Sequence, residues 1–199
     1  MIGFCQFGAG RIGAIHAGKI ASHPDARLQF VVDPDRAAAE RLASRHRAAV
    51  GSQAEALANP AVNAVVIASS TDSHADLVEA AARAGKAVFC EKPLDLDRSR
   101  AEACVAVAEE CGVPLMVGFN RRFDPNFALL ERQIRDGRIG RLELLTITSR
   151  EPAPHDGRTE QRHLRVRRAV RILRVGQRPA RPRSRIAQRR FDLCYVIQQ

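Results

Sequence analysis

Three glycines near the N-terminus have the spacing of a phosphate-binding loop. Gly8, Gly10 and Gly13 follow an apolar run at 2–7, which predicts a buried strand, and open a run to about residue 22 that predicts a helix. In such a unit the first glycine permits a tight turn, the second lets backbone N–H groups approach a pyrophosphate, and the third lets the helix close on the strand. The phosphates would lie at the positive N-terminus of the helix. We therefore expect a dinucleotide-binding loop.

An acidic residue follows at the distance typical of dinucleotide selection. Asp33 ends the next predicted strand, 28–32, and stands 20 residues after Gly13. A carboxylate there accepts hydrogen bonds from both ribose hydroxyls and repels a 2′-phosphate, which favours NAD over NADP, although the nearby Arg36 weakens that preference. The alternative is a glycine-rich turn with an exposed aspartate cap.

A small polar segment follows the third clear strand, predicted at 62–68. Ser69, Thr71 and His74 would lie at the carboxyl edge of a parallel sheet, where open α/β folds bind their ligands. These groups are suited to line a cofactor cleft. The alternative, which the sequence leaves open, makes Asp72 and Ser73 helix N-caps and His74 a first-turn residue.

A lysine comes at the same edge after the next predicted strand, 87–90. Pro93 keeps Lys92 out of the helical region, which points the lysine toward the cleft. A cation there can hold an alcohol oxygen and stabilise the alkoxide that develops as a hydride leaves for a nicotinamide. The alternative is an exposed lysine at a strand end. The Lys92–Pro93 bond is also a candidate cis peptide.

The elements that must position these residues alternate between strand and helix. Such alternation needs crossover connections and predicts a doubly wound parallel α/β sheet of the Rossmann type over residues 1–118. Its strands are expected at 2–7, 28–32, 62–68, 87–90 and 115–118. Its helices are expected from the glycine motif to about residue 22, from an Asp35 cap to about residue 46, at 73–84 before Gly85, and after an Asp97 cap up to Gly112, the last with Ala101, Cys104, Val105, Ala108 and Cys111 on one face.

A second, incomplete α+β domain is expected at 119–153. Its predicted parts are a helix at 124–136, a turn at 137–140 and a strand at 141–149. Residues 154–199 form an irregular, Arg-rich tail that has neither strand alternation nor regular helix caps. The net charge of +10 is concentrated there, because residues 1–150 hold 19 Lys and Arg against 18 acids, whereas 151–199 hold 13 Arg, no Lys and 4 acids.

Composition excludes several classes of protein. No apolar run approaches the ~18 to 20 residues of a bilayer span, and no basic region follows Met1, so we expect a soluble cytoplasmic chain without membrane contact. The 5 cysteines form no C-x-x-C pair, which argues against a disulfide framework and a zinc site. We expect them to be small buried residues, and we expect no metal.

The motifs taken together resemble the Gfo/Idh/MocA dehydrogenases over residues 1 to about 153. The resemblance rests on four segments: Gly8-Ala9-Gly10-Arg11-Ile12-Gly13, Thr71-Asp72-Ser73-His74, Cys90-Glu91-Lys92-Pro93, and Val117-Gly118-Phe119-Asn120-Arg121-Arg122-Phe123-Asp124-Pro125. The last segment and Asp136-Gly137-Arg138-Ile139-Gly140 are most similar to the inositol 2-dehydrogenase branch, which oxidises myo-inositol to its 2-keto form with NAD.

The resemblance implies roles for individual residues. Lys92 would be the catalytic residue at the reacting carbon, and Asn120 and Arg122 would lie near a small polyol or sugar. It also implies a homo-oligomer for full-length members of the family. The residues that would hold NAD are Gly8, Gly10, Arg11, Ile12, Gly13, Asp33, Ser69, Thr71, His74 and Glu91.

One family motif has no counterpart in this sequence. Family members carry a later Asp-x-x-x-His segment whose histidine takes the alcohol proton, and no aspartate after Asp124 has a histidine four residues on. We therefore expect impaired catalysis in an inositol 2-dehydrogenase-like chain. The alternative is an inactive NAD-binding module.

Three hypotheses account for the tail. Arginines without lysine are typical of GC-rich codons read in a shifted frame, which is the favoured explanation. A nucleic-acid arm is disfavoured because stacking aromatics are missing apart from Phe191 and Tyr195. The third is a genuine terminus, helical at 164–175, that docks on the first domain.

Overall fold

The computed structural model of the chain describes residues 1–140 and residue 142. Residues 1–120 belong to one compact unit, and the described residues after 120 belong to a second. The strand predicted at 141–149, the Arg-rich tail with its three explanations and the helix predicted at 164–175 lie outside the described residues.

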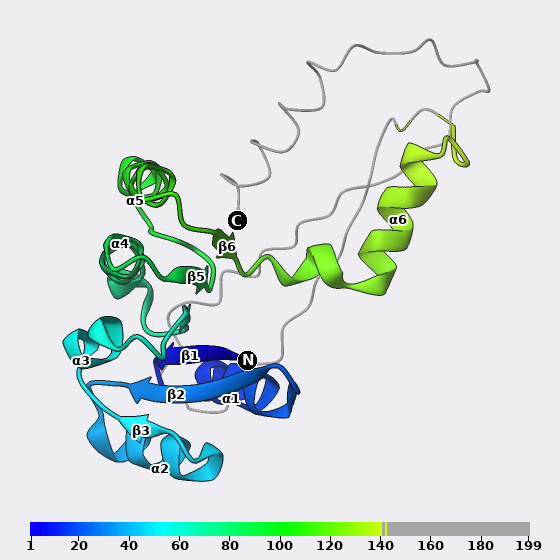
Figure 1. Ribbon diagram of the computed structural model, residues 1–199. Coiled ribbons are helices and arrows are strands. Elements are labelled where there is room, and N and C mark those ends of the chain that lie inside the picture. The colour runs from blue at the N-terminus through cyan, green and yellow to red at the C-terminus, as the bar shows by residue number, and fades with distance from the viewer. Residues whose placement is uncertain (141, 143–199) are drawn as a thin grey trace, which may run out of the picture. The chain divides into compact units, whose positions relative to one another are not determined.

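A six-stranded parallel sheet forms the first unit (Figure 1). Its strand order is β3-β2-β1-β4-β5-β6. The first strand, β1, lies in the middle of the sheet, β2 and β3 extend it on one side, and β4, β5 and β6 extend it on the other. This order confirms the predicted doubly wound fold of the Rossmann type. The strands are β1 (Ile2–Phe7), β2 (Ala26–Val32), β3 (Ala49–Val50), β4 (Ala64–Ile67), β5 (Ala87–Cys90) and β6 (Leu115–Val117).

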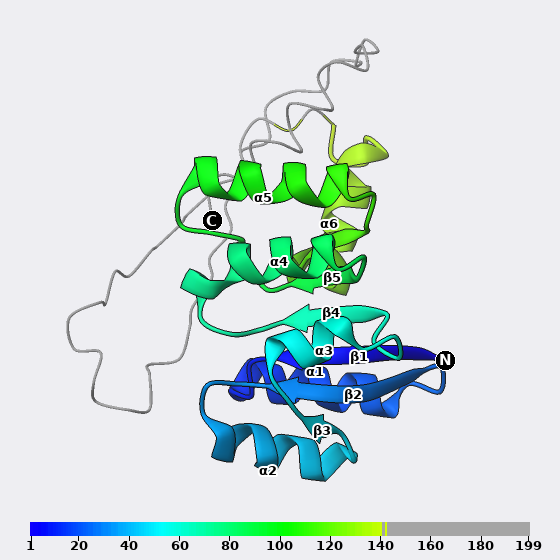
Figure 2. The same cartoon turned by 60° about the vertical axis from the view of Figure 1, so that its left-hand side comes forward.

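Helices cover both faces of this sheet because its strands are apolar on both sides. On one face, α1 (Arg11–Ser22) and α2 (Arg36–His46) bury Ala17, Ile20 and Leu42 against β2. On the other face lie α3 (Gln53–Ala58), α4 (His74–Arg83) and α5 (Arg98–Glu110), with α4 and α5 side by side (Figure 2). Their core includes Cys5, Phe7, Ala56, Val65, Ile67, Val78, Val88 and Cys104.

The predicted helix ends have the expected caps. Asp35 accepts a hydrogen bond from the backbone N–H of Ala38 at the start of α2, and Asp97 accepts one from Arg100 at the start of α5. Gly85 follows α4 with a φ of +69°, which only glycine adopts without strain.

Two elements were missing from the sequence prediction. β3 has only 2 residues and α3 only 6, which is too short for either periodicity to emerge. The start of α3 does carry a readable signal, because Ser52 and Glu55 form a capping box at its N-terminus. The loop after β4 also contains a 3₁₀ turn, η1 (Thr71–Ser73), where a helical start at residue 73 was expected.

One cysteine departs from the prediction. Cys5, Cys90 and Cys104 are fully buried, but Cys111 is exposed. The reason is that α5 ends at Glu110, so Cys111 is its C-cap and does not continue the buried face of Cys104 and Ala108. Cys194 lies beyond the residues that the structure describes.

The described part of the second unit is short. It holds α6 (Pro125–Arg135), preceded by the 3₁₀ turn η2 (Asn120–Phe123), which begins on the last residue of the first unit. Asp124 caps α6 by accepting hydrogen bonds from the N–H groups of Asn126 and Phe127. Gly137 and Gly140 have positive φ, as the predicted turn requires. Among the described residues, no helix is long and apolar enough to cross a membrane.

Candidate functional site

The glycine-rich loop connects β1 to α1 at the carboxyl edge of the sheet. Gly8 has a φ of +93°, and a Cβ on it would meet the carbonyl oxygen of Ala68 at 2.5 Å. A Cβ on Gly13 would meet the Gly8 carbonyl oxygen at 2.0 Å. Both glycines therefore have the steric roles predicted for them, a tight turn and close packing of helix on strand.

Gly10 is different because it faces open space. No atom lies within 4 Å of a Cβ built on it, and it is the N-cap of α1 without any side-chain hydrogen bond to the first turn. The first N–H groups of a helix have no partner inside the helix, and they carry the positive end of its dipole. This end of α1 thus offers backbone donors to an anion.

Asp33 lies directly against this loop. Its Oδ2 accepts a hydrogen bond from the Ala9 N–H at 2.6 Å, and its Oδ1 accepts one from the Asp35 N–H at 2.8 Å. The carboxylate therefore joins the end of β2 to the loop after β1. Each carboxylate oxygen keeps a second lone pair, so Asp33 can still accept hydrogen bonds from ribose hydroxyls.

The segment after β4 is tied to the segment after β5 by a buried histidine. His74 is 2% exposed, its Nδ1 lies 2.7 Å from the Pro93 carbonyl oxygen, and its Nε2 lies 3.2 Å from that of Ser69. The Ser69 hydroxyl contacts that of Ser73 at 2.7 Å, and Thr71 is half-buried. Neither Ser73 nor Asp72 caps α4 through its side chain, so this part of the alternative interpretation is wrong. His74 is a first-turn residue of α4, as that interpretation predicted.

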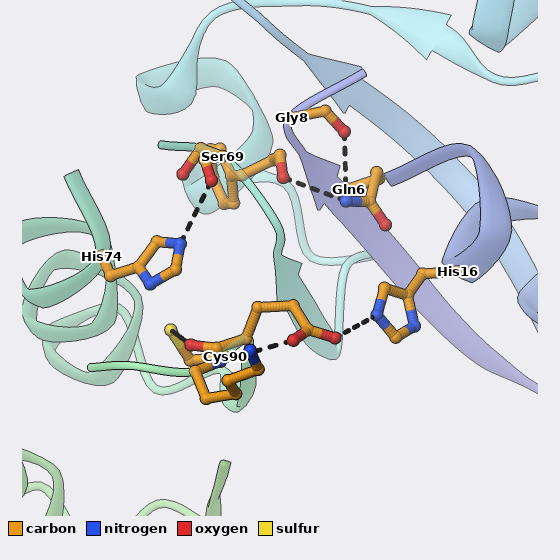
Figure 3. A network of polar contacts seen from close by, with 9 residues as sticks. Gln6, Gly8, His16, Ser69, His74 and Cys90 are labelled. Atoms are coloured by element: carbon orange, nitrogen blue, oxygen red, sulfur yellow. Dashed lines mark hydrogen bonds and ion pairs between the residues drawn. The ribbon is translucent and has the colours of Figure 1, made fainter. Parts of the chain in front are cut away.

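Glu91 is held between two elements at the end of β5. Its Oε1 lies 2.8 Å from His16 Nε2 of α1, and its Oε2 accepts a hydrogen bond from the Lys92 N–H at 3.3 Å. The His16 ring also packs edge-on against the Phe89 ring, with 5.0 Å between the two ring centroids. In Figure 3, His16 and His74 lie on opposite sides of Cys90, the last residue of β5.

Lys92 is exposed at this edge, and the Lys92–Pro93 bond is cis, which confirms the predicted candidate. Asn120 and Arg122 are also exposed, but they belong to different units. The structure therefore brings the glycine loop, Asp33, Ser69, His74, Glu91 and Lys92 to one sheet edge and leaves the position of Arg122 at the site a prediction.

Two buried cysteines, Cys5 in β1 and Cys90 at the end of β5, lie in apolar surroundings. Burial raises the pKa of the Cys90 thiol to about 12, with smaller contributions from Cys104 and Glu91, and burial alone raises that of Cys5 to about 12. Since the thiolate is the reactive form, these thiols stay neutral and pack as small apolar groups.

Two residues of the site were not found from the sequence. His16 stands three residues after Gly13 on the same side of α1, so helical spacing alone would have placed it near the sheet. Gln6 is a polar residue inside the apolar run that predicted β1, and it is fully buried beside the loop (Figure 3).

The fold and this edge define a dinucleotide-binding domain of the Rossmann type. Residues 2–119 match the family model described as an oxidoreductase family with an NAD-binding Rossmann fold, and the chain belongs to this Gfo/Idh/MocA family. The resemblance predicted from the motifs is thereby confirmed.

Individual relatives agree with this assignment. The chain is 51% identical to an inositol 2-dehydrogenase of Rhizobium meliloti over 150 residues, covering 75% of this chain and 46% of that protein. A crystal structure of a myo-inositol dehydrogenase from Corynebacterium glutamicum superposes with a TM-score of 0.68 at 37% identity, over 77% of this chain and 47% of the other.

A third relative was solved with its ligands. This scyllo-inositol dehydrogenase from Lactobacillus casei, with bound NAD(H) and scyllo-inositol, has a TM-score of 0.67 and 29% identity over 71% of this chain and 43% of the other. The chain thus spans a little under half the length of the relatives it matches.

Proposed function

We propose that this chain binds NAD at the loop of residues 8–13 and contributes the cofactor site of a dehydrogenase that oxidises a secondary alcohol of an inositol-like polyol. The observation that carries the proposal is the open, uncapped N-terminus of α1 at Gly10, with the Asp33 carboxylate 2.6 Å from the Ala9 nitrogen beside it. This combination suits a dinucleotide, because the helix end receives the pyrophosphate and the carboxylate receives the ribose hydroxyls.

The other predicted residues fit the same site. Backbone N–H groups at Arg11 and Ile12 belong to the first turn of α1, where the pyrophosphate would bind. Ser69, Thr71 and Glu91 would line the cleft at the ends of β4 and β5. Both ring nitrogens of His74 already face backbone carbonyls, so we propose that His74 contributes by joining the segments of Ser69 and Pro93.

Lys92 is proposed as the catalytic residue. When bound, NAD accepts a hydride from the alcohol carbon. The Lys92 ammonium would orient the alcohol oxygen and stabilise the negative charge that develops on it. Asn120 and Arg122 would hold the remaining hydroxyls of the polyol. An inositol-like substrate is supported by the names of the relatives, of which the chain covers under half.

A second candidate is an NAD-binding module that performs no chemistry. It is favoured by the missing Asp-x-x-x-His pattern among the residues after Asp124. General acid–base assistance is typically worth ~10² to 10⁴-fold in rate, so we propose weak or undetectable turnover for this chain. Self-association and a cytoplasmic location stay predictions of the sequence.

Cofactor binding and turnover separate these functions. We expect the full chain to bind NADH in a fluorescence titration and to reduce NAD⁺ slowly or not at all with myo-inositol. Any turnover should disappear in Lys92→Met, whereas NADH affinity should stay within about twofold, because the lysine is proposed to act on the alcohol. Lys19→Met on the exposed end of α1 is the matched control. Binding without turnover would favour the module, and a folded chain that binds no NADH would refute both candidates.

A further inference from the structure

Gln6 is a buried amide among apolar neighbours. It is fully buried in β1, and its register partners are Val31 in β2 and Val66 in β4. Burial of an amide is unfavourable unless the group finds hydrogen-bond partners. A polar side chain at this position therefore calls for a reason beyond packing.

Its amide donates into the glycine-rich loop. Nε2 lies 2.9 Å from the Phe7 carbonyl oxygen and 3.2 Å from the Gly8 carbonyl oxygen (Figure 3). The Phe7 carbonyl also accepts a hydrogen bond from the Ala68 N–H at 2.9 Å, so it does not depend on Gln6. The two carbonyls fix the orientation of the amide, because a flipped side chain would set its own oxygen against both.

The other end of the amide has no such partner. Within the described part of the chain, the buried Oε1 of Gln6 makes no hydrogen bond. The amide is therefore only half satisfied, which is the costly state for a buried polar group. The benefit to this protein must come from the donor side, that is, from the bond to the Gly8 carbonyl.

The Gly8–Ala9 peptide unit is consequently held at both ends. Its carbonyl oxygen accepts from Gln6 Nε2, and its N–H donates to Asp33 Oδ2 at 2.6 Å. Because a peptide unit is planar, fixing both ends fixes the plane. The next residue along the chain is Gly10, the N-cap of α1. The orientation of the Gly8–Ala9 peptide therefore sets the direction in which the N–H groups at the open N-terminus of α1 point.

We propose that Gln6 is a positioning residue for the dinucleotide loop, and that its amide fixes the Gly8–Ala9 peptide so that the helix end is preorganised for a pyrophosphate. The inference rests on the proposed NAD binding. Preorganisation strengthens binding because less ordering remains to be done when the ligand arrives. Gln6 itself does not touch the cofactor.

Gln6→Met tests this role, because methionine keeps the unbranched shape and removes the donor. The change also removes the unsatisfied Oε1, which should raise the free energy of unfolding. This gain offsets the loss of the hydrogen bond to the Gly8 carbonyl, so the urea midpoint should not fall. NADH should nevertheless bind about five- to tenfold more weakly, the size expected for one neutral hydrogen bond. Without cofactor, the amide protons of Ala9 and Gly10 should exchange faster with solvent in an NMR experiment. Gln29→Met in β2, away from the loop, is the control.

The results for Gln6→Met distinguish a positioning role of Gln6 from a purely structural one. Weaker binding and faster loop exchange at an unchanged urea midpoint support the positioning role. Unchanged exchange and affinity overturn it, and so does an affinity loss that only accompanies a lower midpoint. Should wild-type chain not bind NADH, the proposed function fails, and the exchange rates still show whether Gln6 holds the loop.

Discussion

At the scale of single residues, the three glycines of the loop differ in role. Gly8 and Gly13 are needed for folding, whereas Gly10 is available to a ligand. Gly8 and Gly13 have no room for a side chain, since each would bring a Cβ within 2.5 Å of a backbone oxygen. Gly10 has room in the chain itself and a φ of −71° that any residue adopts. A glycine at that position is therefore not required by the fold, and the proposed pyrophosphate would supply the reason.

Gly10→Ala and Gly13→Ala should separate stability from binding. Gly13→Ala should lower the free energy of unfolding by about 1–3 kcal/mol, because backbone must move to admit the methyl group. Gly10→Ala should leave it within about 0.5 kcal/mol and weaken NADH binding by about tenfold or more, because the methyl group blocks the approach to the helix end. Urea unfolding followed by circular dichroism and NADH fluorescence measure the two effects. Unaltered NADH affinity in Gly10→Ala would show that the ligand binds elsewhere.

Asp33→Ser should change the choice of cofactor. The carboxylate is proposed to accept the ribose hydroxyls and to repel a 2′-phosphate, so its loss should lower the affinity for NAD⁺ more than that for NADP⁺. The ratio of the two dissociation constants should shift toward NADP⁺ by about tenfold, as calorimetry would show, since one charged interaction is typically worth about that much. Asp25→Ser in the exposed turn before β2 should leave the ratio unchanged. The same ratio in both variants would remove Asp33 from the cofactor site.

At the scale of elements, a charge network joins α4 and α5 on the face opposite to α1. Arg100 of α5 forms ion pairs with both Asp76 and Glu79 of α4, and Arg83 pairs with Glu79 at 3.0 Å. The hydrogen bond from Arg100 is the main cause that holds the pKa of Glu79 below its ordinary value of 4.5, and Arg83 adds to it. The network fixes the two helices that support β4 and β5, the strands from which Ser69 and Lys92 extend.

This network predicts a pH dependence of stability. Because the pKa of Glu79 is lower in the folded chain than in the unfolded chain, its contribution is present above about pH 4.5 and is lost as the pH falls through the lowered value. Arg100→Met should therefore lower the urea midpoint at pH 7 and reduce the further drop between pH 7 and pH 3. Arg98→Met, which breaks only the exposed pair with Glu102, is the control. An equal drop in wild type and Arg100→Met would contradict this role of Glu79.

The elements that the sequence predicted well are those with strong local signals. Asp35, Asp97 and Asp124 mark the starts of α2, α5 and α6 because their carboxylates satisfy helix N–H groups that need local partners only. β3 was missed because its 2 residues pair with β2 through contacts that no local pattern encodes.

In the candidate site, too, residues with a local sequence signal were predicted and contacts between distant residues were not. Its glycines, Asp33 and Lys92 are readable because each follows a strand, whereas the contacts of His16 with Glu91 and of His74 with Pro93 join residues that are 75 and 19 positions apart. Such pairs become visible only when the strands have been placed in order. The pairing of Gln6 with its own loop was local, but its importance depends on the Asp33 contact from the neighbouring strand.

At the scale of the whole molecule, the described residues form a six-stranded Rossmann-type sheet, and the chain spans a little under half the length of the relatives it matches. The first unit contains the sheet edge at which a cofactor would bind, and its core is continuous on both faces. NAD binding should therefore depend on the first unit alone, whereas the proposed polyol turnover would also need Arg122 and a proton acceptor. We therefore expect the two proposed activities to separate along the chain.

A calorimetric titration of the full chain with NAD⁺ shows whether this chain binds the cofactor. We expect a saturable heat of binding with one site per chain. The affinity should be lower in Gly10→Ala, although that variant should unfold at the same urea concentration as wild type. A folded wild-type chain that gives no saturable heat with NAD⁺ would contradict the proposed cofactor binding, and the Rossmann sheet would then be a fold without its cofactor site.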